Sequence, residues 1–210
     1  LQAIALACRP APSCKRGDVL NLEPTEIAAW WDKVVAAMVR GLELLRDGCH
    51  VMLPKWLPYQ TMLPPLAAAI AKAGDAKTAM AGARYEKIKR WFWCSVFGQT
   101  YESAPNSRSA KDVAELLSWF AGGAEPEAIT RFTFDPQALR DVSPRQRAIY
   151  RGTICLILGH GAKDFHTQSL ISGKVMDEQG IDDHHIFPAA YLDRSLQIPP
   201  RSRDCVLNRT

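Results

Sequence analysis

The chain has 210 residues, of which 47% are hydrophobic and 23% are charged. A chain of this length and composition can bury a core of its own, which excludes an intrinsically disordered protein. Its apolar runs fall short of the roughly 20 residues that cross a bilayer, which excludes a transmembrane anchor. The net charge of +4 permits a nucleic-acid partner without requiring one.

The six cysteines are scattered along the sequence and form no C-x-x-C pair. A zinc ribbon needs closely spaced pairs of ligands, so this spacing argues against one. No secretory signal is recognised, and a core of this size needs no disulfides, so we expect reduced thiols in a cytoplasmic protein. Both ends look interrupted, and we expect a fragment of a longer protein.

Apolar residues recur every three or four positions from Thr25 to Leu45, which predicts a long amphipathic helix. The proline-rich stretch 54–65 is expected to turn the chain into a short alanine-rich helix that ends near Gly74. Three further helices are predicted: residues 78–97, a helix from an N-cap at Ser109 to Phe120, and a helix from an N-cap at Ser143 to Gly159.

The texture of the sequence changes after Gly161. Helical periodicity disappears, and short segments rich in glycine, aspartate and histidine follow. The sequence therefore predicts a mainly α protein, with a helical domain over residues 1–160 and a smaller unit over residues 161–210.

The densest cluster of reactive side chains lies at residues 182–188, Asp-Asp-His-His-Ile-Phe-Pro. Neighbouring residues on a strand point to opposite sides, so His184 and His185 need not share one role. One imidazole can bind a divalent cation while the other deprotonates a water molecule, the chemistry of a metal-dependent phosphodiesterase. The alternative is a solvated acidic turn with two histidines that have no chemical role.

His185-Ile186-Phe187-Pro188, followed about two dozen residues later by Asn208, resembles the motif of an HNH nuclease, a family that builds a ββα-metal finger. Residues 54–59, 90–93 and 143–150 are similar to the helical region before the HNH motif in GmrSD-like restriction proteins. The resemblance implies a helical domain followed by an HNH finger. It also implies a ParB-like, nucleotide-hydrolysing domain at the N-terminus that this chain lacks.

The resemblance assigns roles to four residues. His185 matches the general base that activates the attacking water, and His184 matches the metal ligand before it. Asn208 matches the central asparagine that orients the base by hydrogen bonding, and Asp183 assists as a ligand or beside the ligands. The implied cofactor is Mg²⁺ or Mn²⁺. Because the family's finger continues into a helix that supplies a further ligand, we expect the finger at 161–210 to be C-terminally incomplete, with weak or absent activity.

Five arginines are predicted to contact nucleic-acid phosphates. Arg201, Arg203 and Arg209 flank the finger itself, and Arg145 and Arg147 lie at the start of the last predicted helix, close to the finger in sequence.

Other basic and histidine residues have alternative explanations. Residues 84–90 are basic and lie among aromatic residues, a pattern that suits either a nucleic-acid contact or a solvated face above a core. His166 falls where a first finger strand is expected, and a structural role is favoured for it, as for His160 and His50.

The sequence therefore predicts a metal-dependent endonuclease that hydrolyses DNA phosphodiester bonds, in restriction of or defence against foreign or modified DNA. The products implied by the resemblance carry a 5′-phosphate and a 3′-hydroxyl. The alternative is a non-catalytic helical module with a degenerate finger that binds DNA or a partner protein.

Overall fold

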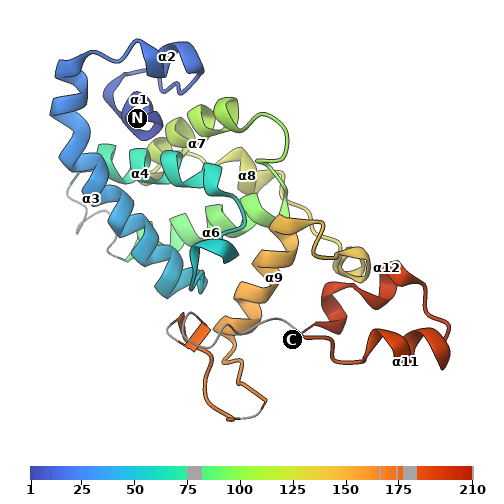
Figure 1. Ribbon diagram of the computed structural model, residues 1–210. Coiled ribbons are helices and arrows are strands. Elements are labelled where there is room, and N and C mark those ends of the chain that lie inside the picture. Colours follow the sequence, from blue (N-terminus) through green and yellow to red (C-terminus); the bar gives the residue numbers. More distant parts are fainter. Residues whose placement is uncertain (75–81, 166, 174, 177–183, 210) are drawn as a thin grey trace. The chain divides into compact units, whose positions relative to one another are not determined.

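The computed structural model describes residues 1–74, 82–165, 167–173, 175–176 and 184–209 (Figure 1). The chain forms two compact units. The first contains residues 1–48 and 59–132, and the second contains residues 49–58 and 133–210. Both units are mainly helical, so the predicted fold class is confirmed at this level.

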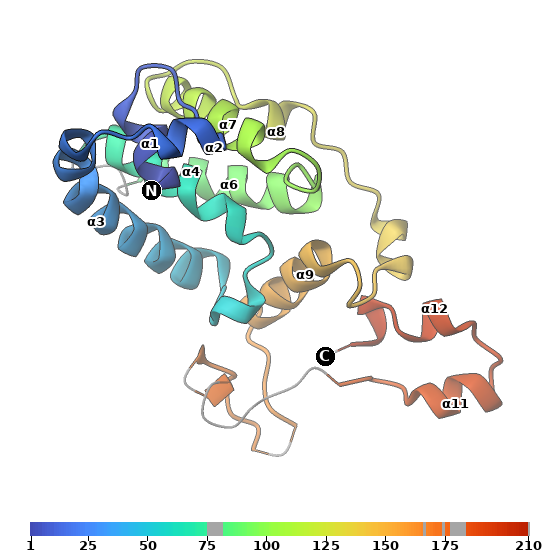
Figure 2. The same cartoon turned by 45° about the horizontal axis from the view of Figure 1, so that its top comes forward.

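The first unit is built around one short, apolar helix. This helix, α4 (Leu63–Lys72), packs against α1 (Gln2–Cys8) and α7 (Pro105–Phe120), as Figures 1 and 2 show. Residues 67–70 of α4 have no exposed surface. A helix that is apolar all round is stable only when it is enclosed, and its alanines let neighbouring helices approach closely. The other helices of this unit are α2 (Arg16–Leu20), α3 (Pro24–Cys49), η2 (Gln60–Met62), α6 (Ala83–Phe97) and α8 (Glu127–Thr130).

The helices predicted over Thr25–Leu45 and in the alanine-rich segment are confirmed as α3 and α4. The predicted helix 78–97 is described from Ala83 onward as α6, and residues 75–81 lie outside the described part. The N-cap prediction for Ser109 is wrong: α7 begins four residues earlier at Pro105, and Ser109 is buried inside it. Pro105 occupies the first turn, where its fixed φ favours helix and its missing N–H has no cost.

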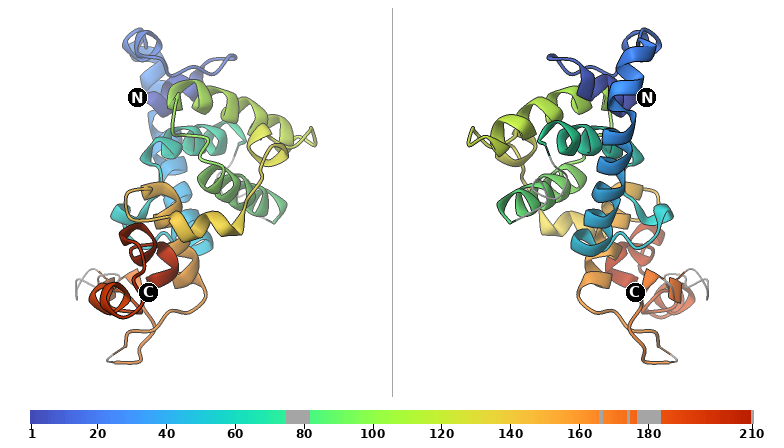
Figure 3. Two further views of the ribbon diagram at one scale, coloured as in Figure 1. Left: turned by 90° about the vertical axis from the view of Figure 1, so that its right-hand side faces the viewer. Right: turned by 90° about the vertical axis from the view of Figure 1, so that its left-hand side faces the viewer.

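The second unit contains η1 (Pro54–Trp56), η3 (Pro136–Asp141), α9 (Arg147–Gly159), α11 (Ala189–Arg194), α12 (Pro200–Arg203) and η4 (Val206–Asn208). Its N-terminal segment, residues 49–58, packs on α9. Arg151 Nη1 donates to Leu57 O at 3.0 Å, and Cys155 Sγ lies 3.7 Å from Trp56 O. The α11 and α12 helices lie side by side near the C-terminus (Figure 3).

Glycine at position 159 leaves room for the His50 ring. A Cβ atom on Gly159 would lie 2.2 Å from His50 Cδ2, far inside van der Waals contact. His50 itself has a φ of 54°, in the left-handed region that non-glycine residues rarely adopt. The last turn of α9 is thus fitted closely to the turn that follows α3.

The N-cap prediction for Ser143 is also wrong, because α9 begins at Arg147. Ser143 and Gln146 instead close a turn that precedes the helix. Gln146 Oε1 accepts hydrogen bonds from Ser143 N at 3.0 Å and from Ser143 Oγ at 2.9 Å, while Ser143 Oγ accepts from Arg145 N at 3.3 Å. These bonds satisfy polar groups at the start of α9 without extending the helix.

Strand pairing in the described residues consists of two isolated antiparallel bridges, Lys163 with Leu170 and His185 with Arg209. The first bridge joins two segments that are close in sequence, and the second joins the segment around His185 to the segment around Arg209. A ββα finger is therefore not shown by the described part of the chain, although its sequence motif falls on the second bridge. No described helix is long and apolar enough to cross a membrane.

Candidate functional site

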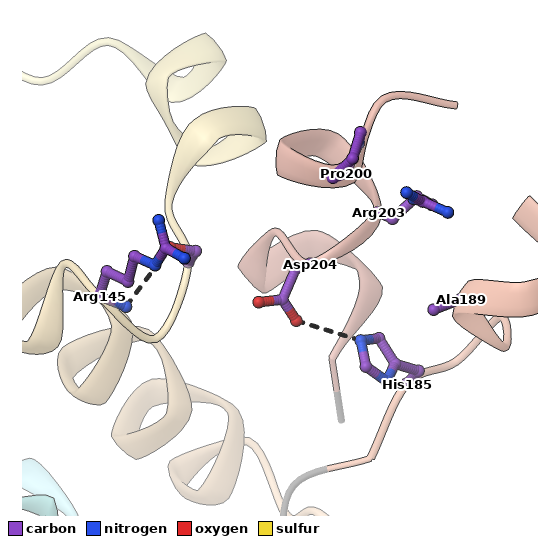
Figure 4. A pocket seen from close by; sticks show the side chains of 7 residues that line it. Arg145, His185, Ala189, Pro200, Arg203 and Asp204 are labelled. Carbon is purple, nitrogen blue, oxygen red and sulfur yellow. Dashed lines mark hydrogen bonds and ion pairs between the residues drawn. The ribbon is translucent and has the colours of Figure 1, made fainter. Parts of the chain in front are cut away.

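A cavity of about 620 Å³ in the second unit contains several of the residues that the sequence marked for chemistry (Figure 4). It is formed by the turn before α9, the segment around residue 185, and helices α11 and α12. The lining residues are Ser143, Arg145, His185, Ala189, Pro200, Arg203 and Asp204.

His185 is held in place by backbone pairing with the C-terminal segment. It forms an antiparallel bridge with Arg209, and Ile186 N donates to Asn208 O at 2.9 Å. Because both sides of the bridge are anchored in the second unit, the position of the His185 side chain is determined by a paired backbone and not by a free loop.

The Asn208 side chain is buried and makes three hydrogen bonds to backbone groups. Its Oδ1 accepts from Phe187 N at 2.8 Å, and its Nδ2 donates to Phe187 O at 3.0 Å and to Arg203 O at 2.9 Å. These contacts join the strand of His185 to the end of α12. Asn208 thus bonds the backbone of Phe187, two residues after His185, and adjoins Arg209, the bridge partner of His185.

The imidazole of His185 faces a carboxylate, as Figure 4 shows: Nε2 lies 3.2 Å from Asp204 Oδ1. The guanidinium of Arg209 bonds to the same carboxylate oxygen. Burial raises the pKa of the Asp204 carboxyl, but the hydrogen bond and charge of Arg209, together with His185, outweigh this effect and hold the pKa below its usual range. Asp204 is therefore ionised at neutral pH.

Two of the five predicted phosphate contacts, Arg145 and Arg203, line the cavity. The turn that carries Arg145 is joined to the C-terminal segment, because Val206 N donates to Val142 O at 2.6 Å. Arg203 also forms an ion pair with the exposed Asp193, at 2.8 Å.

The other three predicted phosphate contacts are not among the described residues that line the cavity. Arg147 is exposed at the first turn of α9 and does not belong to the cavity lining. Arg209 is engaged with Asp204, and the side chain of Arg201 lies outside what the structure describes.

The predicted metal ligands are only partly described. His184 is exposed and does not line the cavity, and Asp183 and His166 lie outside the described residues. Within the described ranges, no three histidine, cysteine, aspartate or glutamate side chains gather as a ligand set. The assignment of His184 and Asp183 as metal ligands therefore rests on the sequence motif.

Sequence reasoning missed the role of Asp204. This residue stands 19 positions after His185, in a segment whose residues follow no period that would place its side chain beside an imidazole. The contact between Asp204 and His185 forms only when the chain folds and His185 pairs with Arg209. No local pattern in the sequence identifies it.

The chain is similar to an uncharacterized protein of Methanocaldococcus jannaschii, MJ0686, with 27% identity. The similarity covers 98% of this chain but 35% of the relative, so the chain spans about a third of that protein's length. No protein-family model matches the sequence, and no solved structure gives a match. Since this relative is itself uncharacterized, the case for an activity depends on the site.

Proposed function

We propose that the second unit is a nuclease site of the HNH type, which hydrolyses phosphodiester bonds of DNA with His185 as the general base. The observation that carries the proposal is the shared cavity: an imidazole and two arginines, Arg145 and Arg203, converge on one space. A base beside fixed cationic groups is what attack of water on an anionic phosphodiester requires.

His185 accepts the proton of the attacking water as the new phosphorus–oxygen bond forms. The bond from phosphorus to the 3′-oxygen then breaks, which leaves a 5′-phosphate and a 3′-hydroxyl that takes up a proton. Arg145 and Arg203 bind the non-bridging oxygens and stabilise the negative charge that develops on them. Asn208 keeps the base in place through the backbone of its strand.

We further propose Mg²⁺ or Mn²⁺ as the cofactor, with His184 and Asp183 as its first ligands. A divalent cation would stabilise charge on the phosphate and the leaving oxygen when bound. This part of the proposal follows from the HNH motif at residues 184–188 and is tested by the cation dependence below.

We place the full-length protein in the restriction of foreign or modified DNA in the cytoplasm, with a nucleotide-hydrolysing domain outside this chain. The GmrSD-like resemblance of the helical region supports this context. The relative is about three times as long as the part that this chain matches, which is compatible with further domains.

Incubation of the chain with supercoiled plasmid tests the proposal. We expect nicking with Mg²⁺ or Mn²⁺ and none with EDTA, and a loss of about 100-fold or more in His185→Ala, the scale of a removed general base. His160→Ala is the matched control, since His160 follows α9 and does not line the cavity, and it should nick like wild type.

Nicking that survives in His185→Ala would overturn the assignment of the base. DNA binding without nicking under either cation would support the alternative, a non-catalytic module with a degenerate finger.

A further inference from the structure

We infer that Asp204, held by Arg209, is a positioning residue that directs the Nε2 atom of His185 away from the reaction and leaves Nδ1 as the proton acceptor. The inference deepens the proposed function and rests on it for its catalytic meaning. Its structural content, the tautomer of one imidazole, stands separately.

The contact fixes the tautomer because a carboxylate can only accept hydrogen bonds. His185 Nε2 lies 3.2 Å from Asp204 Oδ1, within the range of a charge-assisted hydrogen bond. Neutral imidazole has one protonated and one bare nitrogen, so the nitrogen that faces the carboxylate carries the proton. The bare nitrogen is then Nδ1, which has the lone pair that a general base needs.

Arg209 keeps the carboxylate in its ionised, accepting form. Its guanidinium bonds to the same oxygen that faces His185, and its side chain is only 14% exposed. The charge of Arg209 also offsets the negative charge of Asp204, which lines the cavity and would otherwise repel a phosphate.

All three groups are anchored to one backbone frame. Arg209 is the bridge partner of His185, and Asp204 N donates to Pro200 O at 3.2 Å at the end of α12. The imidazole, the carboxylate and the guanidinium therefore keep their order without help from a ligand. A fixed hydrogen-bond partner of this kind restricts the orientation of the His185 ring before substrate binds.

Nitrogen-15 NMR of the histidine side chains tests the tautomer directly. Across a pH series, we expect the His185 signals at the alkaline end, assigned by their loss in His185→Ala, to show protonated Nε2 and bare Nδ1. Asp204→Asn should shift this population toward a mixture, because an amide can both donate and accept.

Asp135→Asn is the matched control. Asp135 accepts from Gln137 N at 2.9 Å at the start of η3, a capping role that asparagine also fills, so the His185 signals should not change. Protonated Nδ1 in the wild type, or identical His185 signals in wild type and Asp204→Asn, would overturn the inference.

Single-turnover cleavage and DNA affinity separate this inference from the proposed function. We expect Asp204→Asn to retain DNA binding and to slow cleavage at saturating DNA by about tenfold or more, as for residues that orient a functional imidazole. Equal cleavage rates in wild type and Asp204→Asn would refute the positioning role. A wild type that binds DNA, shows the expected tautomer and never cleaves would refute the nuclease proposal alone.

Discussion

Through three hydrogen bonds, the Asn208 side-chain amide links the segment around Phe187 to the end of α12. They satisfy the N–H and the carbonyl of Phe187 and the carbonyl of Arg203. Since Asn208 is 7% exposed, water cannot replace these bonds without local opening of the bridge. A defect at Asn208 therefore alters the position of His185 without any contact to its ring.

We predict that Asn208→Ala lowers the free energy of unfolding by about 2–4 kcal/mol, because it leaves buried backbone groups without partners. Urea denaturation measures this change. Asn208→Asp is the informative comparison: it keeps the acceptor for Phe187 N but loses the two donated bonds, so it should destabilise the protein as well. Wild-type stability in both variants would contradict the structural role.

At the level of residues, the sequence identified groups that the fold brings together, but not how they interact. His185, Arg145 and Arg203 were all marked as functional and line one cavity. The role of Asp204 depends on a contact across 19 positions, and the buried contacts of Asn208 depend on the turn of the C-terminal segment. Such contacts follow from tertiary structure and leave no periodic signal.

Helices α4 and α9 show which features of a helix the sequence predicts correctly. The sequence predicts both helices, α4 from its alanine-rich segment and α9 up to its end at Gly159, but it does not predict the starts of α7 and α9, because the capping signals of Ser109 and Ser143 are local and short. Proline at position 105 and the side-chain bonds between Ser143 and Gln146 decide the outcome instead. Element ends depend on a few hydrogen bonds, and element interiors on a whole buried face.

We predict that Gly159→Ala destabilises the protein by about 1–3 kcal/mol, the usual cost of forcing extra atoms into a packed site. The new Cβ would meet the His50 ring at 2.2 Å. Gly17→Ala is the control, because a Cβ at this helical position meets nothing within 4 Å and should be neutral or slightly stabilising. Thermal or urea unfolding compares the two.

The double variant Gly159→Ala/His50→Ala tests the cause. If the clash with the ring is responsible, the double variant loses less stability than the sum of the two single variants, by about 1 kcal/mol or more. Additive effects would show that another contact of α9 is involved.

At the scale of the whole molecule, the proposed DNA binding should weaken as the salt concentration rises. Each arginine that contacts a phosphate releases counterions, so its removal should lower the slope of log affinity against log salt by about 1. We expect this change for Arg145→Ala, measured by fluorescence anisotropy with a DNA duplex. Arg16→Ala, at the start of α2, should keep the wild-type slope, and equal slopes in all three proteins would remove Arg145 from the binding site.

The grouping of residues 49–58 with residues 133–210 has no counterpart in the local sequence. A change of texture predicted a boundary near residue 160, whereas the compact units group residues 133–210 with residues 49–58. The reason is the packing of η1 on α9, through Arg151 with Leu57 and Cys155 with Trp56, which are more than ninety positions apart. Contacts between residues so far apart in the sequence cannot be predicted from local composition.

The insertion of residues 49–58 into the second unit has a consequence for synthesis on the ribosome. The ribosome synthesises this proline-containing segment about ninety residues before α9, the helix on which it packs. Until α9 has been made, the segment has no partner from its own unit. The second unit can therefore form only after residues 133–210 have been synthesised, although residues 49–58, which belong to it, are made much earlier.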